Sequence, residues 1–193
     1  MKRNNKVVCS VMAIIALVTG GVYQTETASS APVGVVEVGG EVVGELIISP
    51  QALELIGNAE SCRLKPYVCP AGLATDGIGN THNVTGKPKT EDQIAKDWVR
   101  NIQSSEKCLV TSMGDASMSQ GQIDAFTSFI FNTGCTRFRK NPDGSETRIF
   151  KHIRQGNYKN ACNELRFWVY GAGKKLPGLV KRRQKEMELC FAN

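Results

Sequence analysis

Histidine is scarce in this sequence, with only His82 and His152 among 193 residues. Neither stands in a metal-ligand spacing such as H-E-x-x-H, which places two histidines on one face of a helix. The sequence therefore predicts no metal site, and we expect no other cofactor.

Long hydrophobic runs and internal repeats are also few. Hydrophobic residues make up 41% and charged residues 22% of the chain, which is close to the average for soluble globular proteins. This composition excludes a polytopic membrane protein and wholesale disorder. The length predicts one ordinary domain with an appendage, and we expect a monomer.

Acidic residues are outnumbered by basic ones, 18 to 24, for a net charge of +6. The positive excess lies beyond residue 46. Such a balance suits an anionic partner, because the summed field attracts nucleic acid, a membrane surface or a cell wall alike. Charge alone does not choose among these three.

Residues 7–25 carry no charge, and basic residues precede them. This pattern is typical of an export signal. A helix over residues 7–23 would reach about 25 Å, slightly less than the roughly 30 Å of bilayer hydrocarbon. We expect residues 1–23 to form a weakly held, uncleaved membrane anchor. A cleavable signal peptide is the alternative, but Glu26 and Pro32 make its cleavage site poor.

Residues 24–46 mix Gly, Ser, Thr and Pro with Val and Glu, which predicts a flexible linker. The alternation of Val with Glu or Gly leaves a short hairpin as the other interpretation, although glycine weakens strands. The remaining residues, 47–193, form the expected catalytic domain.

Two helices and a sheet are expected at the start of this domain. Ser49 and Pro50 begin a helix that ends just after Glu60. Residues 62–85 are rich in Gly, Pro, Thr and Asn, which suggests a small antiparallel sheet. Thr90 caps a helix that carries Ile94, Trp98 and Ile102 on one face. Further helices are expected at about 119–133, 147–155, 157–170 and 178–190. The predicted class is α+β, with helix dominant.

Cys69 lies nine residues after Glu60, and Thr75 lies fifteen residues after it. Glu60 begins an E-x-x-R-L-x-x-Y pattern, and Thr75 begins a T-x-G-x-G pattern. This segment resembles the phage-type lysozymes, glycoside hydrolase family 24, whose signature is a Glu, then an Asp or Cys nine residues on, then a Thr six further. The resemblance continues, in the same order, through residues 131–134, 168–173 and 176–184.

The resemblance implies a lysozyme-like fold, with a cleft between a small sheet and a larger helical lobe. It also implies an inverting muramidase that hydrolyses the β-1,4 bond between N-acetylmuramic acid and N-acetylglucosamine, with peptidoglycan rather than nucleic acid as partner. An inverting glycosidase needs a protonated acid and a second group that activates water. Glu60 suits the first role, because a partly desolvated carboxyl keeps its proton more readily.

Cys69 is the main departure from the family, because many members have Asp there. A thiolate can still act as a base, and a cation such as Arg63 or Lys65 favours its formation. Thr75 would help to position the water through its hydroxyl group. Without the family, Cys69 would be interpreted as a structural disulfide partner in an exported protein.

Other positions follow the family less securely. By resemblance, Phe131 and Asn132 line the sugar cleft. Asp76 and Asn80 replace an apolar residue and a His that are common in the family, so any contact made by that His is not expected. The basic run Lys181, Arg182, Arg183 and Lys185 predicts a mostly solvated helix face, with one arginine approaching Glu60.

Two other functions remain open at this stage. Cys69 with His82 is the type of pair used by cysteine peptidases and amidases, which would also attack the cell wall. A non-enzymatic protein that binds the wall or perturbs the membrane would also fit the basic charge and the apolar N-terminus.

Four cysteines, Cys108, Cys135, Cys162 and Cys190, lie in the expected helical lobe. In an oxidising compartment they form two bridges, and four cysteines allow three connectivities. We predict Cys108 with Cys135 and Cys162 with Cys190, because these pairs close the shorter loops.

Cys9, Cys62 and Cys69 then compete for one bond. A bond between Cys62 and Cys69 would occupy Cys69 and inactivate the enzyme. If Cys9 left the membrane, it would attack Cys62 and free Cys69. This arrangement resembles the signal-arrest-release endolysins. The resemblance implies export to the inner membrane of a bacterial host, facing the periplasm, in a dormant state, followed by release into the periplasm and host lysis. Cys9 as a mere apolar residue of the signal segment is the alternative.

Overall fold

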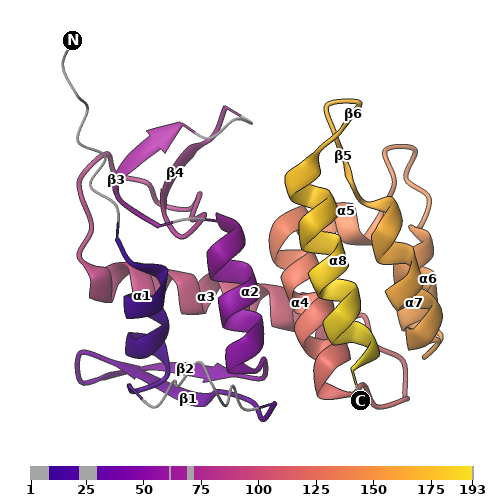
Figure 1. Ribbon diagram of the computed structural model, residues 1–193, viewed down its shortest axis with the longest axis horizontal. Helices are drawn as coiled ribbons and strands as arrows, with labels where there is room; N and C mark the ends of the chain where they lie inside the picture. The colour runs from indigo at the N-terminus through magenta and orange to yellow at the C-terminus, as the bar shows by residue number, and fades with distance from the viewer. Residues whose placement is uncertain (1–8, 22–29, 61, 69–71, 193) are drawn as a thin grey trace.

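The computed structural model describes residues 9–21, 30–60, 62–68 and 72–192. Two lobes lie side by side, and the long helix α3 runs behind the first toward the second (Figure 1). The first lobe contains α1 (Val11–Val18), β1 (Gly34–Val38), β2 (Glu41–Leu46), α2 (Pro50–Glu60), β3 (Arg63–Val68) and β4 (Ala74–Gly77).

The second lobe is mainly helical. After α3 (Glu91–Val110), it contains α4 (Gln120–Thr133), α5 (Cys135–Arg139), α6 (Arg148–Arg154), α7 (Tyr158–Glu164), the 3-10 helix η2 (Leu165–Phe167), β5 (Tyr170–Gly171), β6 (Lys174–Lys175) and α8 (Pro177–Phe191). The sheets among the described residues are two-stranded and antiparallel. The architecture is therefore α+β with helix dominant, as predicted.

Most helices lie where the apolar spacing places them. α2 ends at Glu60. Thr90 caps α3 by accepting a hydrogen bond from the Gln93 N–H, and Ile94 and Trp98 are buried. The helix expected over 157–170 is shorter, because α7 ends at Glu164, η2 follows and β5 begins at Tyr170. Helix α5 was not expected.

The N-terminal apolar segment belongs to the core of the first lobe. α1 packs against α2 and α3, and Ile14, Ile15 and Val18 are buried there. In the part of the chain that the structure describes, no helix is long and apolar enough to cross a membrane. The helix in the described part of the expected anchor is α1, with eight residues. The protein core removes its buried side chains from water.

The expected linker is partly ordered. Residues 34–46 form the β1–β2 hairpin, so the flexible interpretation was wrong there, and the hairpin alternative is correct. Val36, Val38 and Leu46 point into the core of the first lobe and are almost fully buried. This burial outweighs the weakening effect of the glycines. Residues 24–29 lie outside the described part of the chain.

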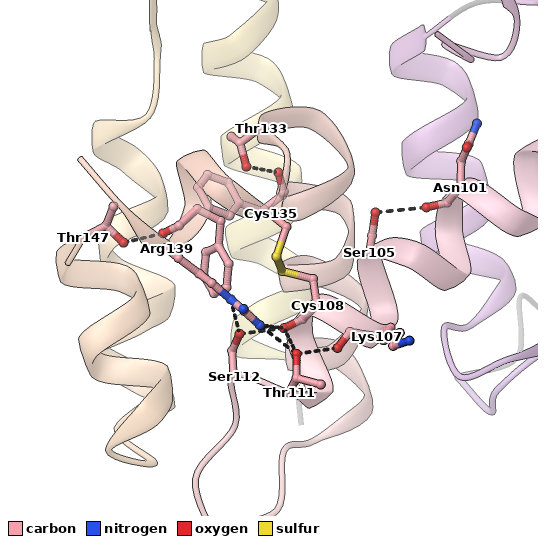
Figure 2. Close-up of a disulfide and its surroundings, with 12 residues drawn as sticks. Asn101, Ser105, Lys107, Cys108, Thr111, Ser112, Thr133, Cys135, Arg139 and Thr147 are labelled. Atoms are coloured by element: carbon pink, nitrogen blue, oxygen red, sulfur yellow. Dashed lines mark hydrogen bonds between the residues drawn. A yellow bond between two sulfur atoms is a disulfide. The ribbon is translucent and has the colours of Figure 1, made fainter. Parts of the chain in front are cut away.

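Two disulfides join elements of the helical lobe in the predicted pairing: Cys108 with Cys135, and Cys162 with Cys190. Figure 2 shows the first, which ties the end of α3 to α5. Beside it the Arg139 guanidinium donates to the Cys108 carbonyl oxygen at 3.1 Å. The two bonds thus cross-link α3 with α5, and α7 with α8.

Candidate active site

Glu60 is the last residue of α2, the helix of the first lobe that lies next to α8 of the second lobe (Figure 1). Its side chain is 23% exposed. The Oε1 atom of Glu60 accepts a hydrogen bond from Nη1 of Arg182 on α8, at 2.5 Å. The buried side chains of Leu53 and Ile56 fix α2 in the lobe. The half-buried carboxyl of Glu60 therefore faces a cation of the other lobe. The expectation that one arginine of the basic run approaches Glu60 is confirmed.

The segment after Thr75 folds directly onto Glu60. Thr75 is buried in β4 and donates its hydroxyl hydrogen to the Leu73 carbonyl oxygen at 3.0 Å. The backbones of Asp76 and Asn80 exchange two hydrogen bonds of 2.9 Å, which close a turn. Within that turn, a Cβ atom on Gly79 would lie 3.1 Å from Glu60 Oε2. Glycine at this position thus lets the backbone approach the carboxyl.

Asp76 and Asn80, the two departures from the family pattern, anchor this turn. The Asn80 amide donates to Asp76 Oδ1 at 2.7 Å and accepts from the Asn101 amide at 3.0 Å. Lys89 forms ion pairs with Asp76 at 2.9 Å and with Asp97 at 2.7 Å. The buried carboxylate of Asp76 is thus paired, and the network ties the turn to α3.

Cys69 lies outside the described residues, in the connection between β3 and β4. Its expected partner in a dormant state, Cys62, is buried and is bonded to Cys9. The Cys9 N–H also donates to the Cys62 carbonyl oxygen at 3.4 Å. Cys62 is therefore not available to Cys69 in this structure.

A cavity of about 320 Å³ lies between the lobes, and Phe131, Gly79 and His82 are among the residues that line it. The role of Phe131 in contacting sugar stays a prediction. Asn132 is half-buried, and its Oδ1 atom accepts a hydrogen bond from Nη2 of Arg183. His82, the partner in the alternative peptidase function, is exposed on the cavity wall.

The basic run on α8 is only partly a solvated face. Lys181 and Lys185 are exposed as expected. Arg182 and Arg183 are buried, so the prediction was wrong for them, and both pair with Glu186. Sequence analysis missed Glu186. The available signal was its position three and four residues after the two arginines, where side chains meet on a helix.

A carboxyl group held at the junction of a small sheet lobe and a helical lobe, beside an interlobe cavity, defines the lysozyme-like class of glycosidases. The comparisons agree with this class. The family described as phage lysozyme matches residues 57–186. A SAR-endolysin of Escherichia phage P1 is 44% identical over 154 residues, which cover 77% of this chain and 83% of that protein.

Two solved structures of P1 phage endolysin Lyz are also similar. Its active form has a TM-score of 0.73 and 38% identity, over 96% of this chain and 95% of that one. Its secreted inactive form has a TM-score of 0.53 and 44% identity, over 72% of this chain and 92% of that one. The chain belongs to the phage lysozyme family. It is a glycoside hydrolase, a muramidase.

Proposed function

We propose that the protein is an endolysin that hydrolyses the β-1,4 bond between N-acetylmuramic acid and N-acetylglucosamine in peptidoglycan, and so lyses a bacterial host. The observation that carries this proposal is the position of Glu60. It is half-buried between the lobes, contacts Arg182 and lies against the turn that Asp76 and Asn80 close. The glycan strand would lie along the interlobe cavity, which Phe131 lines, and Asn132 would be a further contact.

Glu60 would act as the general acid. It donates a proton to the glycosidic oxygen as the bond to the muramic acid C1 breaks. Glu60 is then a carboxylate beside Arg182. Cys69 and Thr75 would hold a water molecule on the opposite face of the sugar, with the Cys69 thiolate taking the proton as water attacks C1. This single displacement inverts the configuration at C1.

Digestion of purified cell wall tests the reaction class. New reducing sugar ends support the proposal, whereas new free amines would mean that a peptide or amide bond was cut, as the Cys69–His82 alternative requires. Glu60→Gln should lower the rate by at least about 100-fold, the usual contribution of a positioned acid. Glu188→Gln, which removes an exposed carboxyl of α8, should leave the rate unchanged. If Glu60→Gln still lysed cells, the non-enzymatic alternative would be favoured.

We further propose that the enzyme is exported in a dormant state, with residues 1–23 in the inner membrane, residues 24–46 as the connection and residues 47–193 in the periplasm. In that state Cys62 is bonded to Cys69. After release, the Cys9 thiolate attacks the Cys62 sulfur, the Cys9–Cys62 bond forms, and Cys69 leaves as a thiolate. One disulfide replaces another, so no external oxidant or reductant is needed.

Three features support this activation. Cys9 and Cys62 are bonded, and α1 lies in the core. Burial of each large side chain of α1, such as Ile14 or Ile15, stabilises the docked state by about 2 kcal/mol. The chain also matches the active form of the P1 enzyme over a larger share of its length than the inactive form.

Serine variants test the exchange. Cys9→Ser should be exported and released, yet remain dormant until reductant is added. Cys62→Ser should be active without any exchange. Intact mass and thiol mapping of membrane and periplasmic fractions should find Met1 in both. A fully active Cys9→Ser protein, with the same free thiols in both fractions, would refute the exchange and leave the muramidase proposal intact.

A further inference from the structure

Glu186 is fully buried between α8 and α4, and it contacts two arginines of its own helix. Its Oε1 atom accepts hydrogen bonds from Arg182 Nε at 3.2 Å and from the Ser128 hydroxyl at 2.7 Å. Its Oε2 atom lies 2.7 Å from Arg183 Nη1. A buried ion pair is often no more stable than an apolar pair of the same size. The contacts of the two arginines indicate another role.

Arg182 connects Glu186 to the catalytic acid. Its Nε atom bonds to Glu186, its Nη1 atom to Glu60 Oε1, and its Nη2 atom to the Ser128 carbonyl oxygen at 3.1 Å. A guanidinium group is planar, so these three contacts define its orientation. Glu186 thus helps to orient the Arg182 guanidinium that contacts Glu60, although Glu186 does not contact Glu60 itself.

Arg183 connects Glu186 to α4. Its Nη2 atom donates to Asn132 Oδ1, and its guanidinium lies 4.8 Å from the ring centroid of Phe129. Burial lowers the pKa of Arg183 to about 10, so the side chain remains a cation at neutral pH. One buried carboxylate therefore holds two arginines, one in contact with Glu60 and one in contact with Asn132.

Glu186 opposes part of the positive charge in this cluster. Arg182 contacts Glu60, and Arg183 also attracts its negative charge. A general acid must hold a proton before the reaction, and two unopposed cations would favour its ionised form. Burial raises the pKa of Glu186 above its ordinary value, because the desolvation of the carboxylate outweighs the opposing effect of the two arginines and Ser128.

We infer that Glu186 is a positioning residue for the muramidase reaction: as a carboxylate it orients Arg182 toward Glu60 and offsets part of the positive charge of the two arginines, which favours the protonated form of Glu60. This inference rests on the proposed role of Glu60.

Glu186→Gln tests the charge, because glutamine keeps the shape. Rates on purified cell wall are measured from pH 4 to pH 9. The alkaline limb of the profile should move to lower pH by about one unit, with activity near pH 5 retained and activity at pH 8 about 10-fold lower. Glu188→Gln is the matched control, because it removes an exposed carboxyl two residues away, and its profile should be unchanged.

Glu186→Asp tests the position, because aspartate keeps the charge but is one methylene shorter. Its alkaline limb should stay in place while the rate falls at every pH. If Glu186→Gln does not fold, this variant decides: wild-type rates in a folded Glu186→Asp protein would overturn the inference. A folded Glu186→Gln protein with the wild-type profile would also overturn it. Glu60→Gln separates the two proposals, since an active Glu60→Gln enzyme would refute the acid itself.

Discussion

Replacing Glu106 with glutamine is expected to stabilise the protein above neutral pH. Glu106 is a buried residue of α3, and its Oε1 atom accepts the backbone N–H groups of Ile47 at 2.8 Å and Ile48 at 3.0 Å. Burial raises the pKa of Glu106 to about 7, and the negative charges of Asp124 and Glu45 add to the rise. The two backbone hydrogen bonds act in the opposite direction.

The sign of the effect follows from proton uptake. In the unfolded chain the carboxyl has its ordinary pKa of 4.5, so between this value and about 7 the folded protein holds a proton that the unfolded chain has lost. Stability therefore falls as pH rises through this window. The gap between the two values corresponds to about 3 kcal/mol at pH 8. Glutamine still offers an oxygen to both N–H groups but carries no charge, so it avoids this cost.

Thermal unfolding at pH 5 and pH 8 measures the effect. At pH 8 the Glu106→Gln protein should melt about 6–12 °C higher than the wild type, because 1 kcal/mol shifts Tm by about 2–4 °C in a protein of this size. At pH 5 the difference should shrink to about 1 kcal/mol, or about 2–4 °C, because this pH lies only slightly above the unfolded pKa of 4.5. Glu37→Gln, at an exposed carboxyl of the β1–β2 hairpin, should follow the wild type at both pH values. A Glu106→Gln protein that is less stable at pH 8 would refute the reasoning, because the hydrogen bonds to the charged carboxylate would then outweigh its desolvation.

Two glycines give further predictions. Gly79 has a φ of +68°, and a Cβ there would lie 3.1 Å from Glu60 Oε2. Gly79→Ala should therefore lower kcat about 10-fold or more and Tm by a few degrees. A wild-type kcat on purified cell wall would contradict the close approach. A Cβ on Gly57 would lie 2.5 Å from Val11 Cγ1, so Gly57→Ala should hinder docking of α1. The Cys9–Cys62 disulfide should then appear more slowly in thiol mapping over time. An unchanged rate would show that α1 docks elsewhere first.

The helices could be predicted because their apolar spacing is local. Ile94 and Trp98 recur at one helical face, and Thr90 supplies the cap, so α3 was predictable from a short window. The disulfides of the helical lobe followed from loop length alone. The β1–β2 hairpin was harder, because its glycines favour a linker, and only the burial of Val36 and Val38 against the rest of the lobe decides otherwise.

The site could be predicted only where the residues lie close in sequence. Glu60 and Thr75 belong to one short segment, whereas Arg182 meets Glu60 across 122 positions. A basic run on a helix is usually solvated, and nothing local to α8 indicates that two of its arginines are buried. Their burial depends on Glu186 and on the carbonyl of Ser128, and these become partners only after α4 and α8 pack together.

The anomeric configuration of the first product tests the proposed mechanism most directly. Wild-type enzyme with the Cys9–Cys62 bond is mixed with purified glycan strands, and proton NMR spectra are recorded before the new reducing ends mutarotate. If Glu60 acts as the acid while Cys69 and Thr75 hold the attacking water, the new muramic acid end should appear first as the α anomer. Initial release of the β anomer would contradict the account, because it would require a covalent intermediate on the enzyme or attack from the same face.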